Sequence, residues 1–436
     1  MAKHRSAAPV ARTPRFQHVP WLAVLTGLLL VLGAAFSTLP VRDVVSRQPV
    51  REVSLDFSPA YLLLSPLWDV LDHLTLLTVP QHIALLVSLL FTLAAWRGFR
   101  AWSRRKAGVP PASPGRAVTR ELLAVAAFLA AFVAVYGYGA IGPRPMAELQ
   151  RREQAVLAVD VHAHTRHSHD GRPGWTAEDV RQWHAASGFD AVYIADHRTF
   201  EGVIEAQGNN PARAGERTII LSALEAVYRG EHVNVLSAGR KYSGIATDDL
   251  RDLDTTAVAL ASLIPGAEPV LVQTFPGDFH EITPASGPGT PGIRAIEIID
   301  GAPRGLRQTR ANRTRIIRLS DSLDITLVAG SNNHGWGRTA PGWTLFRLEG
   351  WQDMSAAELA DNLERQIRDG GRRATRVVER VGTETEGRTL ALTLPALAWR
   401  ITSTLTFPQR VSWFVWTAAV TAVVVVRRRS VAATRR

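Results

Sequence analysis

The chain has 436 residues, of which 46% are hydrophobic and 20% are charged, and its mean hydropathy is +0.01. At about 100–200 residues per domain, this length allows two or three units, and the composition is too apolar for a disordered chain. The absence of cysteine excludes a disulfide framework, a cysteine-ligated zinc site and a thiol nucleophile.

The net charge of +11 is unevenly distributed along the chain. Residues 151–388 carry a net charge of −4, from 28 basic and 32 acidic side chains, and the remainder carries +15. The basic excess therefore lies in flanks that also hold long apolar runs. This pattern favours juxtamembrane charge over a groove for nucleic acid, and we expect no nucleic-acid partner.

Four apolar runs are long enough to predict membrane-spanning helices, at residues 21–40, 76–96, 121–141 and 407–426. The first run follows a basic segment and could also end a signal peptide near Ala34, but we expect it to be retained as an anchor. Residues 59–75 are apolar yet contain Asp69, Asp72 and His73. Because charges are costly inside a bilayer, we expect this segment to be interfacial or re-entrant, with a functional intramembrane site as the alternative.

The basic residues near these runs predict an orientation. Residues 1–20 contain four Lys or Arg, residues 97–120 contain seven and residues 427–436 contain five, whereas residues 41–58 contain three. Since basic loops stay in the cytoplasm, the N-terminus, the 97–120 loop and the C-terminal tail are predicted to be cytoplasmic. The chain is then a multi-pass protein of the cell membrane, with the lipid bilayer as a partner and residues 142–410 outside the cytoplasm.

Residues 155–388 have the sequence pattern of an α/β domain. Helical patterns such as 176–186 alternate with short β-like runs, which predicts a mostly parallel sheet. Seven or eight such strands suit a (β/α) barrel with polar residues at the strand ends forming its active mouth. The runs are 156–161, 191–195, 218–221, 233–236, 270–272, 295–299, 325–329 and 344–348.

Histidines gather in this domain. Nine of the thirteen lie in residues 155–388, and four lie within residues 162–169. His162 and His164 alternate at the end of an apolar strand, so both side chains project to one face and could hold a metal ion. A packed histidine pair would explain these two residues alone, but it explains poorly why further strand ends carry ligand-type side chains. These are Asp196, His197, Glu225, His232, Asn332 and His334.

In these motifs the chain resembles the PHP (polymerase and histidinol phosphatase) family of metal-dependent phosphoesterases. The resemblance spans roughly residues 155–350 and implies a distorted (β/α)7 barrel with two or three divalent metal ions at its mouth. Zn²⁺ or Mn²⁺ is expected, with Fe or Mg²⁺ as alternatives. The matching residues are Asp160, His162, His164, Thr165, Ser168, Asp170 and Gly171 in the first motif, Ala195, Asp196 and His197 in the second, Glu225 and His232 in the third, and Gly330, Ser331, His334 and Gly335 in the last.

The same resemblance implies how the ligands divide. His162, His164 and Glu225 would hold one metal ion, with Glu225 bridging to a second ion near His232. A third ion would be held by His197 and His334, with Asp170 or His169. Asn332 joins the ligand set, and the candidate catalytic residues are His169, Asp170 and Asp196.

Two positions depart from the family pattern. Phe275 stands where a strand-end histidine is usual, and Asn332 stands where an aspartate is usual. Asp278 or His280, just downstream of Phe275, could replace the missing ligand. These departures keep a non-catalytic, ligand-binding barrel among the alternatives.

The expected function is hydrolysis of a phosphoester. This reaction needs charge neutralisation at the phosphoryl oxygens and an activated water, both of which metal ions supply. His167 or His169 could protonate the leaving group, and Arg304 is the candidate contact for an anionic phosphoester substrate because it is the arginine nearest the strand end at Ile299. The alternative enzyme is another metal-dependent hydrolase on a similar barrel, acting on a C–N or other bond.

Overall fold

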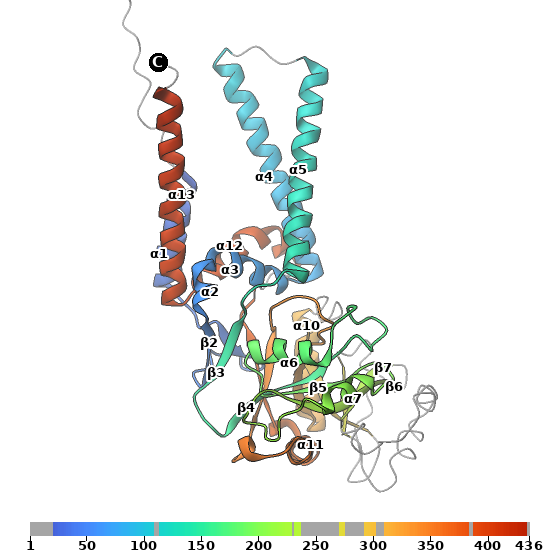
Figure 1. Ribbon diagram of the computed structural model, residues 1–436. Coiled ribbons are helices and arrows are strands. Elements are labelled where there is room, and N and C mark those ends of the chain that lie inside the picture. The colour runs from blue at the N-terminus through green and yellow to red at the C-terminus, as the bar shows by residue number, and fades with distance from the viewer. Residues whose placement is uncertain are drawn as a thin grey trace, which may run out of the picture.

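A bundle of helices stands on a domain built around a curled β-sheet in the computed structural model (Figure 1). The structure describes residues 21–108, 113–228, 231–236, 270–274, 292–301, 309–382 and 387–433. Four residues named from the sequence, Phe275, Asp278, His280 and Arg304, lie outside these ranges.

Among the described residues, three helices are long and apolar enough to cross a membrane. They are α4 (Val79–Lys106), α5 (Pro114–Ile141) and α13 (Phe407–Ala433), and they contain most of the runs predicted at 76–96, 121–141 and 407–426. The run predicted at 21–40 forms a shorter helix, α1 (Trp21–Ala35), of 15 residues. At 1.5 Å per residue α1 spans about 22 Å, less than the roughly 30 Å of a hydrocarbon core.

Short helices form the junction between the bundle and the sheet domain. They are α2 (Pro59–Leu63), α3 (Ser65–Thr75) and α12 (Thr393–Thr404) (Figure 1). Asp69, Asp72 and His73 of α3 are all buried there and hydrogen-bonded. The polar side chains of α3 thus have partners within the protein, and the interfacial or re-entrant location of residues 59–75 stays a prediction.

The main sheet has ten described strands in the order β1-β12-β11-β4-β5-β6-β7-β8-β9-β10. Strands β4–β5–β6 and β8–β9–β10 are parallel within each group, whereas β7 is antiparallel to both of its neighbours. On the other side, β11 is antiparallel to β4 and β12, and β12 is antiparallel to β1. The strands are β1 (Val41–Asp43), β4 (Val156–Ala163), β5 (Ala191–Ile194), β6 (Ile219–Tyr228), β7 (Glu231–Leu236), β8 (Val270–Gln273), β9 (Ile293–Asp300), β10 (Thr326–Gly330), β11 (Gly342–Arg347) and β12 (Arg376–Arg380).

All eight predicted strand runs form strands, but their arrangement differs from a regular barrel. β6 ends at Tyr228 and β7 begins at Glu231, which leaves no room for the crossover of a dozen or more residues that parallel strands require. The sheet curls until the segment after β10 pairs with the end of β4, through the bridge between Asn333 and Ala163. The result is an α/β domain with a curled half-barrel sheet, and the described residues do not confirm the (β/α)7 detail of the distorted barrel expected from the resemblance.

Helices cover the outside of this sheet. They are α6 (Ala177–Ala186), α7 (Glu201–Gln207), α10 (Arg310–Leu323) and α11 (Ala356–Gly370). As predicted, α6 begins after Thr176, whose hydroxyl accepts a hydrogen bond from the Asp179 N–H at 3.1 Å. Fully buried residues such as Leu157, Tyr193 and Phe346 fill the core beneath these helices.

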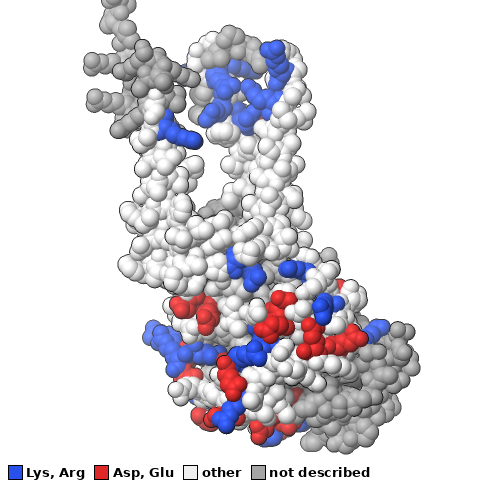
Figure 2. All heavy atoms as spheres, viewed as in Figure 1, with Lys and Arg blue, Asp and Glu red and all other residues white. Residues whose placement is uncertain are grey.

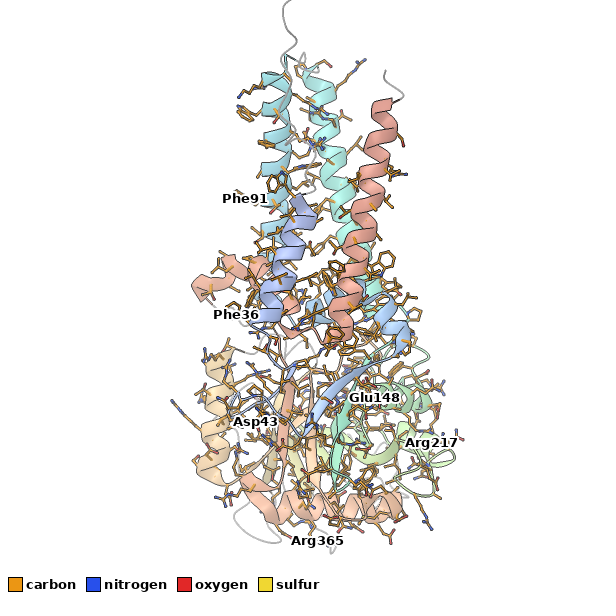
Figure 3. All side chains as sticks on the ribbon, turned by 90° about the vertical axis from the view of Figure 1, so that its left-hand side faces the viewer. Phe36, Asp43, Phe91, Glu148, Arg217 and Arg365 are labelled. Carbon is orange, nitrogen blue, oxygen red and sulfur yellow. The ribbon has the colours of Figure 1, made fainter. Side chains whose placement is uncertain are left out.

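Segments outside residues 155–388 also belong to the sheet domain. β1 is an edge strand of the main sheet, and β2 (Val53–Phe57) pairs with β3 (Ala147–Arg151) in a second sheet. Figure 3 shows Asp43 of β1 and Glu148 of β3 among the side chains of this domain, below the bundle. The folded unit therefore includes the segment between the first two apolar runs, which the sequence predicted only as a loop.

The segment predicted as the basic loop 97–120 forms the end of α4 and the start of α5, and its basic side chains lie at the end of the bundle remote from the sheet domain (Figure 2). The two ends of α4 differ accordingly: the helix begins near the sheet domain (Figure 1), and its last turn, at the far end, contains Arg104, Arg105 and Lys106. This separation fits the predicted orientation, and the side of the membrane on which each end lies remains a prediction.

Candidate metal centre

The end of β4 carries the two histidines at the centre of the site. Every residue of β4 is buried, and His162 and His164 are both 0% exposed. Their Nε2 atoms lie 2.9 Å apart and point to a common space. Gly330 at the end of β10 allows this packing, because a Cβ there would lie 2.8 Å from His162 Cβ and 2.6 Å from a Glu297 oxygen.

Glu225 of β6 is the carboxylate that joins the histidines. Its Oε2 atom lies 3.2 Å from Nε2 of His162, 3.2 Å from Nε2 of His164 and 3.4 Å from Nδ1 of His197. Its Oε1 atom lies 2.7 Å from Nδ1 of His232, at the start of β7. One carboxylate thus contacts four imidazoles, which come from β4 and the residue after it, from β7 and from the segment after β5.

A second group of donors adjoins the first. His164, His197 and His334 offer nitrogen atoms within 4.8 Å of one another, and the same limit holds for the ligand atoms of His162, His164 and Glu225, which are two nitrogens and a carboxylate oxygen. Asp170 lies beside the former set, with Oδ2 3.1 Å from Nε2 of His334 and 3.6 Å from Nε2 of His197. The two sets share His164, so they form adjoining pockets for metal ions.

The charges in the cluster shift the titration of its members. Burial raises the pKa of Glu225, but the charge and hydrogen bonds of His162, together with hydrogen bonds of His164 and His232, hold that pKa well below its usual range. Burial lowers the pKa of His164 to about 3 and the pKa of His197 to about 4. These two imidazoles are therefore neutral at physiological pH, which is the form that binds metal ions.

The donor set fits divalent metal ions. Imidazole nitrogens and carboxylate oxygens converge in one buried place, and these are the ligands that zinc and related ions prefer. The Oδ1 atom of Asn332 is buried and has no hydrogen-bond partner in the described part of the chain. Such an atom is costly unless something binds it, so it is available as a further ligand.

Other predicted site residues are placed differently. Asp196 is fully buried and faces away from solvent, with its two oxygens accepting hydrogen bonds from the N–H and hydroxyl of Thr165 at 2.6 and 2.7 Å. Burial raises its pKa to about 6, although these bonds lower it. This geometry gives Asp196 a positioning role for the turn after His164, and a direct catalytic role for it remains a prediction.

Candidate proton donors differ in their surroundings. The side chain of His169 is 75% exposed at the rim, with its ring 4.7 Å from that of His197. His167 is held between Glu201 and Glu205, whose carboxylates lie 2.9 and 2.8 Å from its nitrogens. Of the two, His169 is the one beside His197 and Asp170, and its catalytic role stays a prediction.

Sequence reasoning missed Glu297 of β9. Its Oε1 atom lies 2.9 Å from Nδ1 of His162, on the ring side opposite the metal cluster. It is fully buried, and burial raises its pKa to about 7. A signal was present, because Glu297 is the single charged residue inside the apolar run 295–299.

Asp160 and Ser168, quoted only as members of a motif, also support the site. The Asp160 carboxylate lies 2.7 Å from Nε2 of His184 and accepts hydrogen bonds from the N–H groups of His162 and Ser331. The Ser168 hydroxyl lies 3.0 Å from Nδ1 of His164 and accepts a hydrogen bond from the His197 N–H. These contacts fix the backbone and rings that carry the ligands.

Comparison with known proteins gives distant structural likenesses. Neither the protein-family models nor the curated proteins include a match. Among solved structures, PsfC from Pseudomonas syringae is 17% identical, with a TM-score of 0.33, over 56% of this chain and 98% of that one. A two-domain protein from Bacteroides vulgatus, containing a predicted PHP-like metal-dependent phosphoesterase, is 14% identical, with a TM-score of 0.30, over 52% and 68%. The lesion-specific endonuclease PfuEndoQ from Pyrococcus furiosus is 11% identical, with a TM-score of 0.32, over 50% and 56%.

Proposed function

We propose that this chain is a membrane-anchored, metal-dependent phosphoester hydrolase. The observation that carries the proposal is the contact of one buried carboxylate, Glu225, with four imidazoles, next to a second set made by His164, His197 and His334. Adjoining sites of this kind suit phosphoryl chemistry, because they place positive charge on both sides of one phosphoryl group. The membrane anchor is supported by the three apolar helices.

Each residue of the cluster has a part in this proposal. His162, His164 and Glu225 would hold one ion, His232 would extend the site beside Glu225, and His197, His334 and Asp170 would hold another. Bound ions would supply Lewis acidity to the phosphoryl oxygens and lower the pKa of water. Asn332 would add a neutral oxygen ligand.

The chain's own residues then handle orientation and protons. In hydrolysis the water oxygen bonds to phosphorus, the P–O ester bond breaks, and the leaving oxygen takes a proton. His169 is exposed at the rim beside Asp170 and His197, where it can give that proton to the leaving oxygen. Asp196 holds the Thr165 turn, and Glu297 orients the His162 ring.

The test uses the full chain in detergent, because β1, β2 and β3 belong to the folded domain. Metal content is measured by elemental analysis, and hydrolysis of 4-nitrophenyl phosphate and bis(4-nitrophenyl) phosphate is measured with Mn²⁺ or Zn²⁺ added. We expect two or more metal ions per chain and turnover of at least one ester. One ion or none without turnover would favour the ligand-binding alternative raised by Phe275 and Asn332.

A matched pair of variants ties activity to the cluster. Glu225→Gln keeps the size of the side chain but removes its charge, so we expect loss of at least one bound ion and at least a hundredfold fall in turnover. Glu201→Gln alters an exposed carboxylate beside His167, and we expect this variant to keep the wild-type metal content and turnover. Wild-type turnover in Glu225→Gln, with the fold intact by circular dichroism, would refute the site.

A further inference from the structure

One cavity connects the metal cluster with the membrane helices. It has a volume of about 1500 Å³. At one end its walls include Glu225, His232 and His334, and at the other they include Leu76 before α4 and Val135 of α5. Pockets for compact small molecules are typically about 300–1,000 Å³, so this cavity is larger than a small phosphoester needs.

The far end of the cavity has an apolar wall and lies at the helices expected in the bilayer. Leu76 and Leu77 line it from just before α4, Pro80 from the first turn of α4 and Val135 from α5, beside the polar side chains of Thr78, His82 and Tyr136. Val135 is 42% exposed and lies within the apolar stretch of α5. The cavity wall is therefore continuous with the surface that faces lipid, and it can accept an apolar chain without bringing that chain into water.

Basic side chains also line the cavity. Arg310 and Arg313 contribute to its wall from α10, and Arg42 contributes from β1. Arg42 and Arg313 both pair with the carboxylate of Glu379, which lines the cavity too and holds their guanidinium groups in place. Guanidinium groups recognise phosphate, and here they share one cavity with the metal cluster.

We propose that the substrate of the hydrolase is a membrane lipid with a phosphoester headgroup. The headgroup lies at the cluster formed by Glu225, His197 and His334, and the apolar chain lies against Leu76, Pro80 and Val135. That the lipid is a substrate rests on the proposed function. That a lipid binds at this place is argued from the cavity alone. The proposal also explains the membrane anchor, because the anchor would hold the opening of the cavity at the level of the lipid headgroups.

Inhibition by two alkyl phosphates tests the inference on the full chain. Methyl phosphate and dodecyl phosphate share a headgroup, and each competes with whichever 4-nitrophenyl ester is turned over in the same detergent. We expect dodecyl phosphate to inhibit at a concentration at least a hundredfold lower. Equal inhibition by both would overturn the lipid inference and leave the hydrolase proposal standing.

Two paired variants distinguish binding of the alkyl chain in the cavity from its partition into the detergent. Val135→Trp narrows the apolar end, so we expect it to raise the inhibition constant of dodecyl phosphate at least tenfold and to change that of methyl phosphate less than twofold. Val133→Trp adds the same side chain on the same helix, at a residue that is 68% exposed and does not line the cavity. We expect Val133→Trp to change neither constant, and an equal effect of both variants would overturn the inference.

A binding experiment does not depend on turnover. The probe is dodecyl phosphate with a diazirine at the end of its alkyl chain. It is mixed with the protein in the presence of a metal chelator, which prevents turnover, and is then photoactivated. The labelled peptides are identified by mass spectrometry. Label within residues 76–82 or 132–140 that unlabelled dodecyl phosphate displaces supports the seat. Label spread evenly over α4, α5 and α13 would overturn it. Specific label without any hydrolysis would support the lipid seat and overturn the hydrolase proposal.

Discussion

At the scale of single residues, the site depends on carboxylates that are kept from water and paired with imidazoles. Glu225 contacts the nitrogens that would bind metal, whereas Glu297 contacts the opposite nitrogen of His162. A carboxylate that contacts the nitrogen facing away from the metal, as Glu297 does, fixes the tautomer and orientation of the imidazole and makes it a stronger ligand. Glu297 is therefore predicted to affect metal binding without touching the metal.

Glu297→Gln tests this. Removing such a carboxylate typically weakens metal binding about 10–100-fold, and we expect a loss in that range. The measurement is a titration of the metal-free full chain with Zn²⁺ or Mn²⁺. Glu364→Gln, at a buried glutamate of α11 far from the cluster, is the control and should bind metal as the wild type does. Similar losses in both variants would show that any buried charge matters equally.

Asp190 predicts a pH dependence of stability away from the metal centre. It lies just before β5, where its carboxylate accepts a hydrogen bond from the Ala158 N–H at 2.7 Å and pairs with Arg151. Burial raises its pKa to about 6, from 3.8 in the unfolded chain, and outweighs these partners. The folded protein thus holds a proton that the unfolded chain has lost, and this contribution to stability falls as pH rises from about 4 to 6.

Asp190→Asn removes that titration. A shift of about two units corresponds to roughly 3 kcal/mol, so the stability of the variant relative to the wild type should increase by up to this amount between pH 4 and pH 7. The thermal unfolding midpoints of both proteins across this range provide the measurement. A difference that stays constant with pH would contradict the assignment.

At the scale of elements, α3 connects the bundle to the sheet domain through Asp72. Its Oδ1 atom lies 3.0 Å from the guanidinium of Arg144, after α5, and its Oδ2 atom lies 2.8 Å from that of Arg380 on β12. The hydroxyls of Thr339 and Tyr61 donate to the same carboxylate at 3.0 and 2.9 Å. Asp72 and both arginines are buried, so water cannot replace the carboxylate as the partner of the two guanidinium groups.

Asp72→Asn should therefore be strongly destabilising. Breaking a buried ion pair by removing one charge costs about 3–5 kcal/mol, because the remaining charge is left buried. We expect a lower thermal unfolding midpoint in detergent and faster proteolysis between the sheet domain and the bundle. Asp56→Asn, at an exposed aspartate of β2, should change neither. If Asp72→Asn were as stable as Asp56→Asn, the junction would not depend on this ion pair.

The elements also show what the sequence could predict. The apolar runs identified eight of the ten described strands of the main sheet, and the ligand-type residues at their ends come together because strand ends meet at one edge of the curled sheet. Strands β1, β2 and β3 were missed, since they are three to five residues long and lie outside the domain's apparent bounds. Strand β12 was missed inside those bounds, since only two of its five residues are apolar. The direction of β7 was also missed, because apolar periodicity locates a strand without giving its direction. Glu297 was missed because no strand-end motif contained it.

At the scale of the whole molecule, the cavity, the junction and the charge distribution suggest one arrangement. The sheet domain lies at one end of the bundle, and the basic residues of the predicted loop 97–120, in the end of α4 and the start of α5, lie at the other (Figure 2). The cavity begins at the sheet-domain end of α4 and α5 and leads to the metal cluster. If the basic loop is cytoplasmic, the cavity opens toward the outer leaflet of the membrane, and the proposed lipid comes from that leaflet.

The absence of cysteine allows a direct test of this orientation, because a single introduced thiol is the only one in the chain. Arg365 on α11 is exposed on the sheet domain (Figure 3), and Arg104 is exposed near the loop end of α4. Since basic loops are retained in the cytoplasm, a membrane-impermeant maleimide added to spheroplasts should label Arg365→Cys, whereas Arg104→Cys should be labelled only after lysis. The reverse pattern would place the metal centre in the cytoplasm and move the opening of the cavity to the inner leaflet.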